Sequence, residues 1–131
     1  MKILLDTKVI YDALFEPSNL NEMVKTILTD ETNILFISPL SEWKMDNDAK
    51  LGKTRVDGKM LHDASVAFGL TALPLTSEAL VEYRKISCVI DPNDHAEINL
   101  VLLGQAIEND CLFLTYDGNL VKVPGSKIIA A

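Results

Sequence analysis

The chain has 131 residues with 48% hydrophobic and 24% charged residues, which suits one soluble globular domain, residues 1–131, with a core of its own. The net charge of −7 argues against general nucleic-acid binding, because a phosphate backbone is repelled at long range. Asp6 follows only three apolar residues and no apolar run approaches the roughly 20 residues of a membrane span, so we expect a cytoplasmic protein without a signal peptide or membrane contact.

The first half of the chain predicts two strands and four helices from its hydrophobic periodicity. In chain order these are strand Lys2–Leu5, helix Val9–Phe15, a helix to Leu28, strand Ile34–Ile37, a helix from Pro39 or Ser41 to Leu51, and helix Arg55–Phe68. Pro17 ends the first helix, and Ser18 or Asn19 is expected to cap the second, Asn19 in a capping box with Glu22. Gly69 is expected to end the fourth.

The second half continues this alternation. It predicts strand Thr71–Leu75, helix Ser77–Ile86, a long helix from the Asp91–Asp94 turn to Ile107, and strands Cys111–Thr115 and Lys127–Ile129. Both cysteines, Cys88 and Cys111, lie in apolar stretches and are expected to be buried and reduced. The whole pattern predicts an α/β fold of three layers, α/β/α, with a mostly parallel central sheet of four to five strands. Such sheets place their sites at the carboxyl ends of the strands.

Two acids occupy that position. Asp6 follows the first strand directly, and Asp117 follows the fourth by two residues. Each has an ordinary alternative role, which for Asp6 is the N-cap of the next helix. With a third acid from the long helix, the two would hold Mg²⁺ or Mn²⁺, which prefer oxygen ligands, and such a cation suits phosphodiester hydrolysis.

Several short segments resemble the PIN-domain family, in particular the VapC-type ribonuclease toxins of toxin–antitoxin pairs. They appear in family order and spacing along essentially the whole chain: Leu4–Thr7, Ala13–Pro17, Ile37–Trp43, Lys50–Lys53, Leu73–Thr76, Gly104–Ile107, Leu114–Asp117 and Val123–Gly125. The resemblance implies a PIN-like fold, a metal-dependent endoribonuclease with an RNA substrate, a small antitoxin as partner, and a homodimer.

The family typically holds its metal with four acids, and the resemblance carries over Asp6 and Asp117. At the start of the third helix, Lys44 stands where the toxins usually have Glu. Glu42 lies about 200° away around the helix, whereas Asp48 lies one turn after Lys44 on the same side and is the better substitute.

The acid of the late helix depends on the alignment. Counting back without gaps from Asp117 puts the family's aspartate at Asn99, whereas matching the Asp91–Asp94 turn puts it at Asp94, with Glu97 one turn later as support. The alternative role of Asp94 and Glu97 is a capping pair at the helix start.

Other side chains have supporting or ordinary roles. Thr7 and Thr115 are expected to orient carboxylates or to finish strands, and a lone histidine, His95, to be a surface or capping residue. Trp43 is expected to pack in the core. A cluster of basic residues between positions 44 and 59 is either a solvated helix face or a strip that contacts RNA phosphates, with Lys44, Lys50, Lys53 and Arg55 as its members in that role.

Three functions remain open from the sequence. The first is the metal-dependent ribonuclease toxin, with Asp6, Asp94 and Asp117 as catalytic metal ligands. The alternative is a catalytically degenerate PIN-like domain that binds protein or RNA, in which Lys44 pairs with Asp6 or Asp117 in the metal's place. A phosphatase with Asp6 as nucleophile is the third, although Lys8 stands where haloacid-dehalogenase phosphatases need an aspartate.

Overall fold

The computed structural model describes residues 1–91, 93 and 95–131, which fold around a parallel five-stranded sheet with the order β3-β2-β1-β4-β5. The strands are β1 (Lys2–Leu5), β2 (Ile34–Ile37), β3 (Thr71–Ala72), β4 (Leu112–Thr115) and β5 (Ile128–Ala130). The helices are α1 (Thr7–Phe15), α2 (Glu22–Thr29), α3 (Pro39–Lys50), α4 (Gly58–Phe68), α5 (Ser77–Ser87) and α6 (Glu97–Glu108), with the 3₁₀ helices η1 (Pro17–Asn19) and η3 (Gly118–Lys122).

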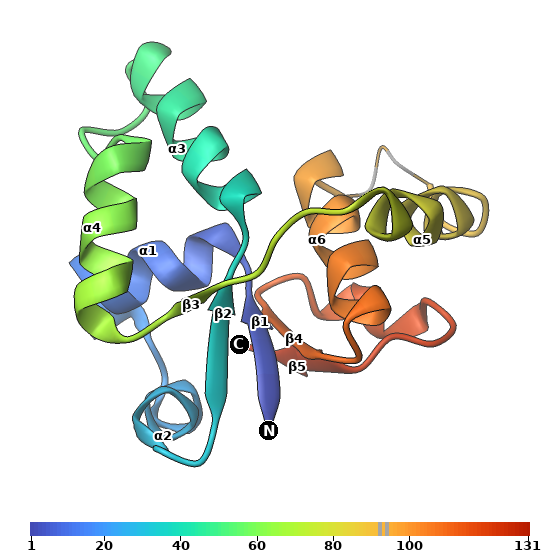
Figure 1. The fold of residues 1–131 in the computed structure, drawn as a ribbon, viewed down its shortest axis with the longest axis horizontal. Helices are drawn as coiled ribbons and strands as arrows, with labels where there is room; N and C mark the ends of the chain where they lie inside the picture. The colour runs from blue at the N-terminus through green and yellow to red at the C-terminus, as the bar shows by residue number, and fades with distance from the viewer. Residues whose placement is uncertain (92, 94) are drawn as a thin grey trace.

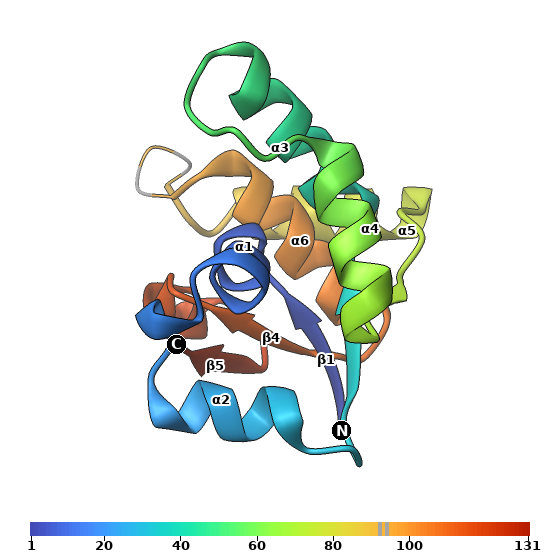
Figure 2. The ribbon, with the colours of Figure 1, turned by 90° about the vertical axis from the view of Figure 1, so that its left-hand side faces the viewer.

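The core has two halves, one on each face of the sheet. Neighbouring residues of β1 divide between them, because side chains alternate along a strand: Leu5 enters one half and Leu4 the other. Helices α1, α2 and α4 cover the first face, and α5 and α6 cover the second (Figures 1 and 2). The predicted three-layer α/β/α fold with a mostly parallel sheet is therefore confirmed.

Helices α5 and α6 pack at unusually close range. A Cβ atom on Gly104 would lie 2.7 Å from the carbonyl oxygen of Ala79 and 2.9 Å from the backbone nitrogen of Tyr83. Only glycine leaves room for this approach, which explains its place in the middle of a buried helix.

Most predicted elements are confirmed, and the differences lie at their ends. The cap of α2 is Asn21, whose side chain accepts the N–H of Val24 at 2.9 Å, so the predicted capping box between Asn19 and Glu22 is wrong. Strand β3 is shorter than predicted, since Pro74 has no N–H to continue the ladder.

In the later part of the chain the structure differs from two further predictions, the start of α6 and the burial of one cysteine. Helix α6 begins at Glu97 rather than at the Asp91–Asp94 turn, of which positions 92 and 94 lie outside the described residues. Cys111 is buried as expected, but Cys88 is exposed because it caps the end of α5 at the surface. Among the helices of the described ranges, none combines the length and the apolar character needed to cross a bilayer.

Candidate metal centre and adjoining groove

Asp6 lies at the carboxyl end of the central strand and is only 3% exposed. Its side chain caps α1 by accepting the N–H of Val9 at 2.8 Å, and it also accepts the N–H of Tyr116 at 3.2 Å. Burial raises the pKa of Asp6 above its ordinary value, while hydrogen bonds from Thr115 and the two amides oppose the rise. The negative charge of Asp117 raises this pKa further. The expected capping role of Asp6 is confirmed, and the carboxylate is still held beside a second acid.

Asp117 reaches the same edge because β4 pairs with β1, with Leu114 opposite Leu5. Its backbone N–H donates to the Thr115 hydroxyl at 3.0 Å, and its carboxylate contacts Nδ1 of His95. The side chain of His95 is only 6% exposed, so the expectation of a surface or capping histidine is wrong. No sequence pattern indicates this pair, since the two residues are 22 positions apart.

Asp6 and Asp117 fit one hard divalent cation. Their mutual repulsion is relieved by a positive charge between them, and Mg²⁺ needs only one or two protein carboxylates when waters and substrate phosphates complete its shell. Within the described ranges, no three acidic, histidine or cysteine side chains gather as a metal-binding group. Asp94, the third acid of the sequence hypothesis, lies outside the described residues.

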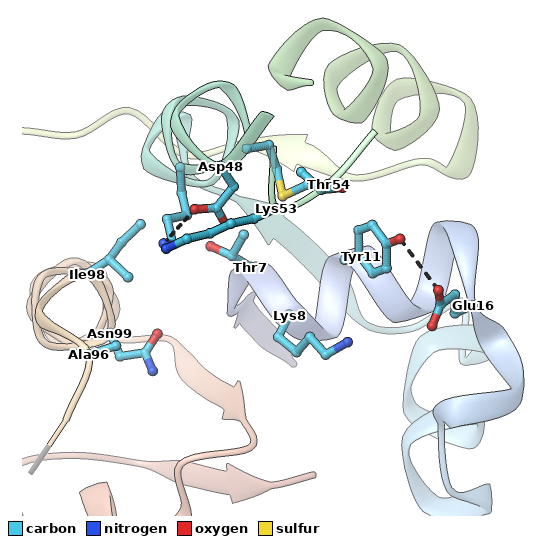
Figure 3. A pocket seen from close by; sticks show the side chains of 12 residues that line it. Thr7, Lys8, Tyr11, Glu16, Asp48, Lys53, Thr54, Ala96, Ile98 and Asn99 are labelled. Carbon is cyan, nitrogen blue, oxygen red and sulfur yellow. Dashed lines mark hydrogen bonds and ion pairs between the residues drawn. The ribbon is translucent and has the colours of Figure 1, made fainter. Parts of the chain in front are cut away.

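A groove of about 470 Å³ lies beside this edge, between α1, α3 and the start of α6. Figure 3 shows its wall, with Thr7 and Lys8 on α1, Asp48 on α3 and Asn99 on α6. Three lysines, Lys8, Lys44 and Lys53, and two carboxylates, Glu16 and Asp48, line it, and Lys8 also pairs with Asp12 at 3.0 Å. The groove thus gathers lysines on an acidic protein, and Lys53 lies there beside the two paired ones.

The positions where the resemblance expected further acids are part of this groove. Asn99 lines it and is half-buried, and Thr7 shares a hydrogen bond of 2.9 Å with Ser41 at its inner end. Lys44 pairs with Asp48 at 2.9 Å, one helical turn away. The hypothesis that Lys44 pairs with Asp6 or Asp117 is therefore wrong, because Asp48 on its own helix is the nearer partner.

The remaining acidic candidates turn to other partners. The carboxylate of Glu42 contacts Nδ1 of His62 on α4 and so does not line the groove. Glu97 is exposed and accepts the hydroxyl hydrogen of Tyr83 at 3.0 Å.

The basic strip that the sequence suggested is divided between the groove and the surface outside it. Lys44 and Lys53 line the groove, whereas Lys50 and Arg55 are exposed outside its wall. Each of these two pairs has one member on α3 and one after the turn through Gly52, which has a φ of 73°.

A buried network beside Asp6 was not foreseen from the sequence. Asp12 is 2% exposed and accepts hydrogen bonds from the Tyr116 hydroxyl at 2.6 Å, Lys8 at 3.0 Å and Asn19 at 3.3 Å. Burial opposes ionisation of this group, but the three donors outweigh it and lower the pKa of Asp12. Tyr116 thus ties the loop that carries Asp117 to α1.

The sequence matches no protein-family model and no curated protein. Solved structures, in contrast, match over nearly the full chain. A chain of VapBC2 from Rickettsia felis, bound to a promoter DNA fragment, has a TM-score of 0.71 at 12% identity and covers 99% of this chain and 98% of its own. A chain of VapBC-1 from nontypeable Haemophilus influenzae gives 0.68 at 15% identity, with 99% and 98% covered.

A chain of the FitAcB structure from Neisseria gonorrhoeae gives a TM-score of 0.63 at 19% identity, covering 97% of this chain and 96% of its own. At these identities the likeness concerns the fold. The chain therefore has the PIN-like three-layer fold shared with chains of VapBC and FitAB toxin–antitoxin complexes, as the sequence resemblance implied.

Proposed function

We propose that the chain is a metal-dependent endoribonuclease that hydrolyses RNA phosphodiester bonds as the toxin of a toxin–antitoxin pair. The observation that carries the proposal is the pair of carboxylates, Asp6 and Asp117, at the ends of neighbouring strands beside a groove lined by three lysines. The fold shared with chains of toxin–antitoxin complexes supports it. A small antitoxin partner, a homodimer and a cytoplasmic location belong to the same proposal.

Asp6 and Asp117 would hold Mg²⁺ or Mn²⁺, with Asp94 as a third ligand. When bound, the cation would polarise the phosphate and lower the pKa of a water molecule beside it. His95 and Thr115 keep the Asp117 segment in position through their hydrogen bonds. Lys44 and Lys53 draw the RNA backbone into the groove, and Lys50 and Arg55 extend the contact at its end.

A specific observation favours a second function, a degenerate module that binds RNA or protein without cleavage. Lys44 and Asn99 stand in the groove where acids are expected, so the site lacks two negative charges, and cation affinity follows ligand charge. Only the first function predicts a cation at Asp6, so metal binding distinguishes the two.

The deciding experiment titrates Mn²⁺ into the purified full chain, free of antitoxin, and follows thermal unfolding. At a hundred times Kd, binding adds about 2.7 kcal/mol to stability, a rise in Tm of roughly 10 °C for a chain of this length. Asp6→Asn keeps the helix cap but removes the charge, so we expect the rise to vanish. Asp63→Asn, an exposed acid on α4, is the matched control and should keep it.

Cleavage of a mixed RNA substrate with Mn²⁺, abolished by Asp6→Asn, completes the test. If millimolar Mn²⁺ shifts neither protein and no RNA is cleaved, the nuclease proposal fails and the degenerate module stands.

A further inference from the structure

Trp43 lies on the surface, although an aromatic residue in an α-helix of a small domain was expected in the core. It is 60% exposed, because α3 buries Ser41 and Met45 and Trp43 lies about 200° around the helix from each. Leaving most of an indole in water forgoes a large hydrophobic gain. Packing in the hydrophobic core therefore does not explain why position 43 is a tryptophan.

Trp43 lines a second groove of about 420 Å³ that adjoins the first. Its wall combines one side of α3 with parts of α5 and α6, and it includes Trp43, Lys44, Tyr83, Ala96, Glu97 and Ile98. Three residues, Lys44, Ala96 and Ile98, belong to both grooves. A chain laid along the first groove can therefore continue past Lys44 onto Trp43.

The two grooves differ in chemistry. The first is lined by three lysines, whereas the second is mainly apolar and shares only Lys44 with it; the carboxylate of Glu97 in the second is held in place by the Tyr83 hydroxyl. A carboxylate disfavours a phosphate but accepts hydrogen bonds from the amino group of a base, and an indole face stacks on any base. The second groove thus suits an uncharged planar ring with N–H donors.

We infer that Trp43 and the groove around it bind an unpaired nucleobase of single-stranded RNA whose backbone lies across Lys44 in the first groove. The inference rests on the proposed function in so far as both place RNA in the first groove. It adds a base-binding subsite, which favours single-stranded over double-stranded substrate because a paired base cannot stack on the indole.

The experiment uses the fluorescence of the full chain, in which Trp43 is the sole tryptophan and reports its own contact. A single-stranded RNA of about ten nucleotides, a length within the range of such grooves, is titrated at low salt with EDTA so that no cleavage occurs. We expect RNA to quench the emission and an abasic chain of the same length to leave it nearly unchanged.

Affinity measured by anisotropy of labelled RNA gives the second arm. Trp43→Ala should weaken binding roughly 5- to 100-fold and Trp43→Phe much less, since phenylalanine keeps a stacking face. Val66→Ala removes a similarly exposed apolar side chain on α4 and should bind RNA as the wild type does. Because Trp43 is exposed, the melting temperature should stay within a few degrees in both Trp43 variants.

Three results overturn the inference. The first is RNA binding without quenching, and the second is wild-type affinity in Trp43→Ala. The third is emission that shifts with protein concentration in the absence of RNA, together with a dimer that Trp43→Ala dissociates, since a second copy then covers the indole. The fate of the nuclease proposal is separate: quenching without Mn²⁺-dependent cleavage supports the base subsite alone, and cleavage without quenching supports the nuclease alone.

Discussion

The buried carboxylate of Asp12 illustrates how a single residue couples the site to the scaffold. Its three donors come from α1, η1 and the end of β4, so one charge joins segments that are distant in sequence. The same contact raises the pKa of Tyr116, chiefly by burial and then by the hydrogen bond to Asp12, so its hydroxyl remains a donor.

Removing that donor should reduce stability in a way that depends on pH. Because the folded pKa of Asp12 is lowered, its ionised form stabilises the fold above the unfolded pKa, and this stability is lost as pH falls through the folded value. We expect Tyr116→Phe to lose about 1.5–3 kcal/mol of unfolding free energy at pH 7, typical of a hydrogen bond to a charged group. The loss should shrink when urea unfolding is repeated below about pH 4, where Asp12 of the unfolded chain begins to protonate, and should be smallest once the pH has fallen through the lower folded pKa.

Tyr11→Phe is the matched control, since the Tyr11 hydroxyl reaches only the exposed Glu16 at 3.5 Å. It should change stability little at either pH. An equal loss for Tyr116→Phe at both pH values would contradict an ionised Asp12 as the acceptor.

At the scale of elements, close contact between α5 and α6 fixes the layer that carries Asn99 and Ile98 into the two grooves. Ile86 of α5 and Leu100 and Leu103 of α6 are buried in the core half on that face. Gly104 permits the approach, so the position of α6 depends on the absence of one side chain.

Gly104→Ala tests this packing, because helix propensity and close packing predict changes of opposite sign in the free energy of unfolding. Helix propensity alone predicts that alanine stabilises a helix interior by about 1 kcal/mol. The added Cβ would meet the backbone of α5, which cannot rotate away, so we expect a net destabilisation of about 2 kcal/mol in urea unfolding. A stabilised variant would show that α5 moves aside freely.

Elements also show where prediction from sequence stops. The strands β1 and β2 were predicted to the residue, because each is a short, mostly apolar run that ends directly at a polar residue, Asp6 or Ser38. Trp43 was misplaced because periodicity gives the spacing of a helical face but not its direction, and α3 buries the small Ser41 instead.

At the scale of the whole molecule, one sheet supports both halves of the core. Leu4 and Leu5 are neighbours in β1 yet belong to opposite halves, so neither half can form without the strand that completes the other. The net charge of −7 belongs to the whole molecule, whereas the groove gathers three of its lysines, so RNA bound as proposed would contact only a small part of the surface.

This shared sheet predicts a single cooperative unfolding transition. By calorimetry of the metal-free chain we expect an enthalpy of about 90 kcal/mol near 60 °C, with a ratio of calorimetric to van't Hoff enthalpy close to one. Two resolved transitions, or a ratio well above one, would mean that the two faces unfold independently.

The sequence by itself determined the three-layer fold, the parallel sheet and the placement of Asp6 and Asp117, because these depend on local periodicity and on residues that directly follow strands. Only the tertiary structure decided that Lys44 pairs with Asp48, that His95 holds Asp117 and that Trp43 faces a groove. Such choices depend on which partner is nearest once helices from distant parts of the chain are packed, and spacing along the sequence does not encode that distance.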